Sequence, residues 1–205
     1  MARHSTPRQQ QQMRTLIAQA AARFIAEGLD DFASAKRKAA RQLGAEDTHC
    51  LPTNEEIESA LRSYQALYLG ARQTRHIQEL RKKALQAMQQ LQDYSPMLTG
   101  SVLAGTAGAY ANINLHLFAN DSKEIELAML NQGIPYEHGE KRFRSGERSL
   151  TLPTLTFQLD DTSVECAVLT PQQQRLALRS PVDGKSQERA SISQVEKLLA
   201  EADLA

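Results

Sequence analysis

The sequence predicts an α+β fold with a helical N-terminal region, residues 1–95, followed by a mixed α/β domain, residues 96–205. Apolar residues recur every three or four positions through the first region, as they do on one face of a helix. After Ser95-Pro96, apolar and polar residues alternate and glycine becomes more frequent, as in strands and turns. Proline disfavours helix at the residue before it, so this dipeptide marks the predicted boundary.

The helices of the first region are predicted from the residues at their ends. Gly28 and Gly44 follow the first two apolar stripes, and glycine is the residue that most often ends a helix. Thr53 and Glu56 form a capping-box pattern in front of a third stripe. Gly70 either separates the third helix from a fourth one or weakens a single long helix.

The second region is predicted to contain a sheet and a helix. Asp121 precedes an apolar helical stripe and is predicted to be its N-cap. Asp160-Asp161 is predicted to be the turn of a hairpin. Residues 138–148 are polar and basic and contain glycine, so they are predicted to form a loop. The predicted strands are residues 97–101, 113–118, 134–137, 150–159 and 164–169.

Composition argues against several classes of protein. No apolar run approaches the ~18 to 20 residues of a membrane span, and the polar first twelve residues lack the apolar segment of a signal peptide. We therefore expect a cytoplasmic protein. Cys50 and Cys166 are far apart without metal-ligand spacing, so unpaired thiols are expected. Residues 1–95 hold 14 Lys/Arg and 10 Asp/Glu, and the rest of the chain reverses these numbers. That asymmetry is weaker than the excess in a strong nucleic-acid binder.

One segment of the mixed domain combines a Gly-Ser pair with a spaced pair of asparagines. Gly100-Ser101 ends the first predicted strand, and ten residues separate Ser101 from Asn112. Asn112 and Asn114 are two positions apart on a predicted strand, so their side chains point to the same side. His116 continues this row. It is expected to be a half-exposed polar residue, with a role as a ligand or proton carrier as the alternative.

This layout resembles the signature of the polymerase-β-like nucleotidyltransferase superfamily, in which Gly-Ser is followed, after a spacer of about ten residues, by two aspartates on a strand. The resemblance covers roughly residues 97–171 and implies a nucleotidyltransferase-like mixed sheet. It implies that Gly100 and Ser101 bind nucleotide phosphates at a helix N-terminus. The aspartates of the family hold two divalent ions. A third carboxylate comes from a later strand, where Glu165 is the best match.

Asn112 and Asn114 stand where the family has its aspartates. An amide keeps the shape of the side chain but lacks its charge, and Mg²⁺ prefers carboxylate oxygens. We therefore expect no resident metal and a catalytically degenerate member, a pseudoenzyme with a binding or regulatory role. Restoring aspartate at both positions is expected to restore divalent-ion binding together with Glu165.

Two alternatives stay open at this point. An active nucleotidyltransferase would move NMP from an NTP to an acceptor, with Mg²⁺ held by Glu165 and by Asp121 or substrate phosphates. Alternatively, the helical region is an interaction or nucleic-acid-binding module and the mixed domain is an inert scaffold. Arg142 and Arg144, in the predicted basic loop, are candidates to bind phosphates opposite the Gly-Ser turn, with solvated surface charges as the alternative. The expected partners are a nucleotide, a protein or a nucleic acid, and no membrane.

Overall fold

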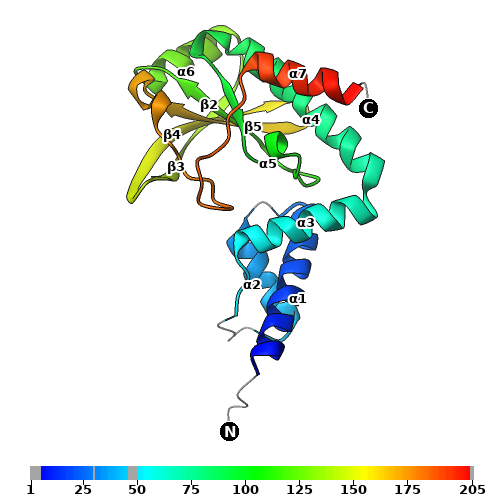
Figure 1. The fold of residues 1–205 in the computed structure, drawn as a ribbon. Coiled ribbons are helices and arrows are strands. Elements are labelled where there is room, and N and C mark those ends of the chain that lie inside the picture. The colour runs from blue at the N-terminus through cyan, green and yellow to red at the C-terminus, as the bar shows by residue number, and fades with distance from the viewer. Residues whose placement is uncertain (1–5, 30, 46–49, 204–205) are drawn as a thin grey trace. The chain divides into compact units, whose positions relative to one another are not determined.

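The computed structural model describes residues 6–29, 31–45 and 50–203, which form an α+β protein (Figure 1). The chain divides into two compact units. The first contains the residues up to 73 with the segments 106–110 and 181–183, and the second contains the rest. The change from helices to strands falls near residue 96, where the sequence predicts it. Within the described residues, no helix has the length and apolar character needed to cross a membrane.

Side-chain caps fix the starts of the helices in the first unit. These helices are α1 (Pro7–Ala26), α2 (Phe32–Gln42) and α3 (Asn54–Tyr68). The carboxylate of Asp31 accepts hydrogen bonds from the first backbone N–H groups of α2. Thr53 and Glu56 form the predicted capping box of α3. Such caps satisfy N–H groups that have no partner inside the helix.

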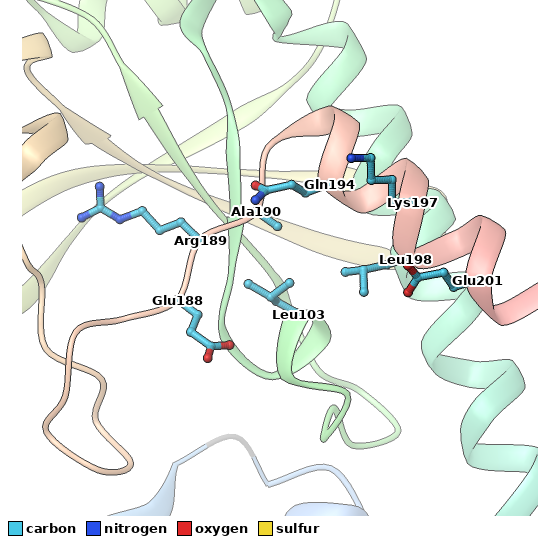
Figure 2. Close-up of a pocket in the computed structure, with 8 residues that line it drawn as sticks. All are labelled: Leu103, Glu188, Arg189, Ala190, Gln194, Lys197, Leu198 and Glu201. Atoms are coloured by element: carbon cyan, nitrogen blue, oxygen red, sulfur yellow. The ribbon is translucent and has the colours of Figure 1, made fainter.

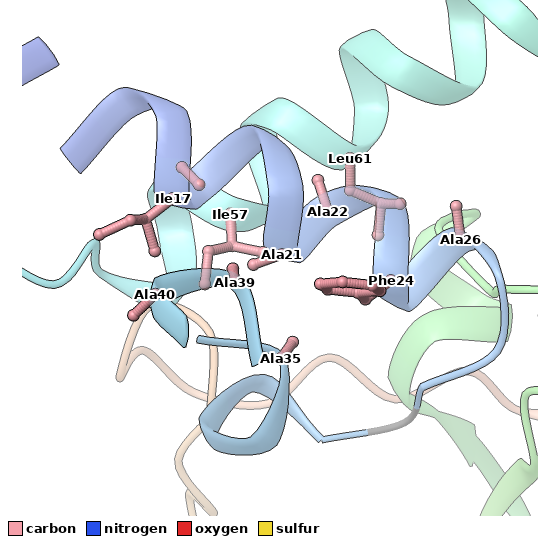
Figure 3. Packing of buried hydrophobic residues seen from close by; sticks show 11 residues of the cluster. Ile17, Ala21, Ala22, Phe24, Ala26, Ala35, Ala39, Ala40, Ile57 and Leu61 are labelled. Carbon is pink, nitrogen blue, oxygen red and sulfur yellow. The ribbon is translucent and has the colours of Figure 1, made fainter. Parts of the chain in front are cut away.

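Small apolar residues let these helices pack closely (Figure 3). The core-facing sides of α1 and α2 are largely alanine, so their backbones can approach each other, while larger side chains fill the remaining space. Ile17 of α1 and Ile57 and Leu61 of α3 are almost completely buried. The core also contains Ala18, Ala21, Ala22, Phe24, Ala26, Ala35, Ala39 and Ala40.

The glycine-containing segment 106–110 also belongs to the first unit. The buried Gln65 donates a hydrogen bond from Nε2 to the backbone oxygen of Thr106, at 3.2 Å. A β-carbon on Gly108 would lie 2.3 Å from the backbone oxygen of Ile25. Because backbone at that distance would have to move, this position requires glycine.

The second unit is built on one five-stranded mixed sheet with the strand order β1-β2-β5-β4-β3. β2 and β5 are parallel, and the other neighbouring strands are antiparallel. The strands are β1 (Met97–Thr99), β2 (Ile113–Phe118), β3 (Tyr136–Ser145), β4 (Arg148–Leu159) and β5 (Thr162–Leu169). The helices are α4 (Gly70–Gln90), which enters this unit at Thr74, α5 (Gly100–Ala104), α6 (Ser122–Asn131) and α7 (Ile192–Asp203), with short 3₁₀ turns η1 (Gln92–Tyr94) and η2 (Pro171–Arg175).

The two faces of this sheet differ in chemistry. Alternation along the strands places one set of residues on an apolar face, which is buried. Its central members are Ile113, Leu115, Leu117, Leu155, Phe157, Val164 and Cys166. The opposite face, here called the polar face, carries Asn114, His116, Thr154, Thr156 and Glu165. At one end of the polar face, Phe118, Leu152, Ala167, Leu169 and Leu178 form a small separate apolar cluster.

Several sequence predictions are confirmed by these elements. β2 covers the predicted residues 113–118. Asp121 caps α6 through a hydrogen bond from the backbone of Lys123. Gly70, with a φ of 41°, separates α3 from α4. Asp160 adopts a φ of 53° in the predicted turn between β4 and β5.

The loop predicted at residues 138–148 is wrong, because these residues form most of β3 and the turn into β4. The strand predicted at residues 134–137 is replaced by β3, which starts two residues later and continues to Ser145. β3 is an edge strand, and charged residues are common on such strands because they discourage pairing with other chains. In the structure, Lys141 and Phe143 are less exposed than Arg142 and Arg144. This alternation is hard to recognise in the sequence, because charged residues stand at both kinds of position.

Truncating Leu61 in α3 tests the core of the first unit. Leu61 is 2% exposed, so Leu61→Ala should lower the free energy of unfolding by about 2 to 5 kcal/mol, because it leaves a cavity. Leu67 lies on the same helix and is 75% exposed, so Leu67→Ala should change it by less than about 0.5 kcal/mol. Urea denaturation of both variants measures this difference. Equal losses would contradict the packing described.

Candidate functional site

Three neighbouring strands position Asn114 and Glu165 on the polar face. β2 and β5 run parallel with these two residues directly paired, so their side chains leave the sheet on the same side. On the other side of β2, Thr99 of β1 pairs with Asn114 and donates from Oγ1 to its backbone oxygen, at 3.3 Å. The sheet therefore brings together two of the residues singled out from the sequence.

The Gly-Ser pair lies beside this position. Gly100 begins α5 with a φ of 75°, a left-handed conformation that favours glycine. A β-carbon there would lie 3.4 Å from Nδ2 of Asn114. Ser101 follows in α5, which has a single turn, and its side chain is half-buried. The strand, Gly-Ser turn and asparagine strand thus meet at one end of the polar face.

A lysine ammonium occupies the space between Asn114 and Glu165. Nζ of Lys141 donates a hydrogen bond to Oδ1 of Asn114 at 3.2 Å and forms an ion pair with Oε1 of Glu165. The side chains of Lys141 and Glu165 are 43% and 24% exposed. The pair is therefore accessible to solvent at one edge, and its opposite charges cancel.

The contacts of Asn114 explain why an amide suits this position. A lysine ammonium can only donate hydrogen bonds, so the oxygen of the Asn114 amide faces it. The other end, Nδ2, donates to the backbone oxygen of Asn112 at 3.1 Å. An aspartate would place an oxygen against that carbonyl, and the hydrogen bond would be lost. Asn112 lies just outside β2, contrary to the expectation that it shares the strand with Asn114, and it contributes to the cluster through this backbone oxygen.

The reach of Lys141 requires a curved hairpin. β3 is three strands away from β2, a separation of about 14 Å in a flat sheet. That exceeds the span of a four-carbon lysine stem, so β3 and β4 must curl over the polar face. Gly139 permits this curvature, because a β-carbon there would lie 2.7 Å from Oγ1 of Thr154, its partner in the strand pair.

His116 is buried, which corrects the expectation of a half-exposed polar residue. It is 1% exposed, its ring meets Phe143 edge-on at 5.7 Å, and Nδ1 has no hydrogen-bond partner among the described residues. Burial, with smaller contributions from the charges of Arg189 and Lys141, lowers the pKa of His116 to about 3. His116 is therefore neutral at physiological pH, which removes the proposed role as a proton carrier there.

Three other residues singled out from the sequence do not join this cluster. Asp121 caps α6 and lies seven residues beyond Asn114, past the far end of β2. That separation is about 20 Å along an extended strand. Arg142 and Arg144 alternate with Lys141 along β3, so their side chains leave the hairpin on the opposite face. They therefore do not face the Gly-Ser turn.

Lys141 is the site residue that sequence reasoning missed. From the sequence, Lys141 belongs to the predicted basic loop of residues 138–148, which gives no indication of its partners. The signal lay in the alternation of Lys141 and Phe143 opposite Leu150 and Leu152, which is typical of a hairpin with one covered face. Within the described residues, no group of three His, Cys, Asp or Glu side chains is placed to hold a metal ion.

A hollow lies between α5, α7 and residues 188–190, away from this cluster, with a volume of about 430 Å³ (Figure 2). Its lining combines glutamate carboxylates and a lysine ammonium with apolar side chains. Arg189 points away from it and donates to the backbone oxygens of Gln174 and Leu176. The lining residues are Leu103, Glu188, Arg189, Ala190, Gln194, Lys197, Leu198 and Glu201. This hollow lacks a convergent set of polar groups that would select a ligand.

Comparison with known proteins finds no relative of this chain: no protein-family model, no curated protein and no solved structure matches it.

The burial of neutral His116 predicts a pH dependence of stability. Its folded pKa lies below the usual unfolded value of about 6.5, so between these values the unfolded state binds more protons. The free energy of unfolding should therefore fall as the pH is lowered through 6.5, by up to about 1.4 kcal/mol per pH unit from this residue. Urea denaturation at about pH 7 and pH 5.5 measures the loss. The variant His116→Gln should lose less over the same interval, and an unchanged loss would refute the assignment.

Proposed function

We propose that this chain is a nucleotidyltransferase-fold protein that has lost nucleotide transfer and keeps a non-catalytic binding or regulatory role. The observation that carries the proposal is the ammonium of Lys141, which lies between Asn114 and Glu165. In the superfamily that the sequence resembles, divalent ions are held at this place. Here the positive charge is supplied by the chain itself.

The charges of the cluster support the loss of a metal. Asn112 and Asn114 are neutral, and Lys141 cancels the charge of Glu165. A divalent cation would therefore find no net negative charge. It would also meet a fixed ammonium, which repels each unit of charge at 4 Å by about 4 kcal/mol at an effective dielectric of 20. Mg²⁺ gives up its water ligands reluctantly and needs carboxylates or phosphates to replace them.

The arrangement of the strands supports the proposed family. One mixed sheet holds the Gly-Ser turn, the asparagine strand and the Glu165 strand as neighbours, as the resemblance requires. The alternative of an active enzyme loses support, because Asp121 is engaged as a helix cap past the end of β2, seven residues beyond Asn114. In an active enzyme, Mg²⁺ would then have to be held by Glu165 and substrate phosphates alone, despite repulsion by the charge of Lys141.

Binding of Mn²⁺ by a set of variants tests the proposal. Wild type should bind Mn²⁺ weakly. Contrary to the expectation from sequence alone, the double variant Asn112→Asp, Asn114→Asp should gain little, because Lys141 would pair with the new carboxylates. Adding Lys141→Met to the double variant should leave three carboxylates without an ammonium partner. The Kd for Mn²⁺ should then fall by about 100-fold or more relative to the double variant, equivalent to about 2.7 kcal/mol. Titration calorimetry measures these affinities.

A matched control separates the position of Lys141 from its charge. Arg142 is its neighbour on the opposite face of β3, so adding Arg142→Met to the double variant changes the net charge equally and should not tighten Mn²⁺ binding. Tight binding by wild type, or NMP transfer above background, would refute the loss of the site. No gain in the triple variant would show that these residues do not form a metal-site geometry.

A further inference from the structure

The outer face of the β3–β4 hairpin displays arginines away from Lys141. Arg142 and Arg144 are exposed and lie two residues apart on β3, so they share one face, about 7 Å apart along the strand. Within the described residues, neither guanidinium has an ion pair or hydrogen bond. Thr151 and Ser149 stand directly opposite them on β4 and add two exposed hydroxyls.

A third arginine extends this face. Leu178 bridges to Ser145 at the edge of β3 and is buried in the cluster with Leu152, on the Lys141 side. Arg179 is the next residue, so alternation directs its side chain to the other side, beside Arg144. Its backbone N–H donates to the oxygen of Arg144 at 2.7 Å. We call Arg142, Arg144, Ser149, Thr151 and Arg179 the arginine ribbon.

The guanidinium of Arg179 is held in place within this arrangement. Its Nη1 donates to the backbone oxygen of Gly184 at 2.7 Å, which leaves its other N–H groups available. Glu140 is the acidic residue on the same face of β3, at its inner end beyond Arg142. The three guanidinium groups therefore make a positive surface, although the whole chain has a net charge of zero.

We propose that the arginine ribbon binds the phosphate backbone of duplex DNA. Guanidinium groups bind phosphate oxygens in a bidentate way, and serine and threonine hydroxyls are common additional donors to phosphates. The major groove of B-DNA admits a two-stranded β-ribbon between its phosphate rows. The corresponding groove of an RNA duplex is too narrow. Phe143, the aromatic residue between the two arginines, faces the other side, so no aromatic ring lies between the two guanidinium groups to stack on a base as in a single-strand binder.

This inference does not rest on the proposed loss of the metal site, because the two surfaces lie on opposite faces of the hairpin. Contacts from three arginines to phosphates would release about three condensed counterions. The logarithm of the binding constant should then fall with the logarithm of the salt concentration with a slope of about −2.7. Removing one contact should reduce that slope by about one.

Fluorescence anisotropy of the full chain with a labelled duplex DNA of about 20 base pairs, at salt concentrations of about 50 to 200 mM, tests the proposal. Arg142→Ala and Arg144→Ala should each reduce the slope by about one, and the double variant by about two. These side chains are exposed, so folding should survive. Arg148→Ala is the control. Arg148 is on the same hairpin, but it shares the face of Leu150, opposite the arginine ribbon. It should leave the slope unchanged.

Duplex RNA of the same length and an arginine-binding phosphopeptide serve as competing ligands. Weaker binding of both than of DNA is expected. The proposal is overturned if DNA does not bind, if Arg148→Ala weakens binding as much as Arg144→Ala, or if either competing ligand binds more tightly than the DNA duplex.

Discussion

The polar face of the sheet depends on the contact of Lys141 with Asn114 and Glu165. A half-buried carboxylate on a sheet needs a positive partner, and in this chain an edge strand provides it. The other features of the site follow from that requirement. Asn114 accepts a hydrogen bond at its amide oxygen and donates one from its amide nitrogen. Gly139 lets the hairpin curl far enough for the Lys141 ammonium to reach Asn114 and Glu165. The resulting cluster has no net charge.

The same hairpin gives the chain two chemically different surfaces. Side chains alternate along β3. Because Lys141 points toward the polar face, Arg142 and Arg144 point to the opposite side. The inner surface uses its positive charge to neutralise Glu165, whereas the outer surface leaves its charges available to a ligand. The neutral cluster around Glu165 and the basic outer surface are thus two consequences of one strand.

Local signals predicted much of the fold and only part of the site. The bounds of β2, the cap at Asp121 and the capping box at Thr53 follow from residues that are neighbours in sequence. The pairing of Asn114 with Glu165 also agrees with the proposed family layout. The role of Lys141 could not be predicted, because it depends on the curvature of a hairpin whose charged residues are also typical of a loop. The burial of His116 likewise depends on Phe143 from that hairpin.

Anomalous diffraction from crystals of the full chain soaked in Mn²⁺ and a nucleoside triphosphate tests whether Lys141 excludes a metal ion from the polar face. If the Lys141 ammonium occupies the site, no manganese peak will appear between Asn114 and Glu165, and density will show the ammonium in hydrogen-bond contact with both side chains. A manganese peak at that position, with Lys141 displaced into solvent, would contradict it, because it would mean that the lysine leaves the site whenever metal and nucleotide are present.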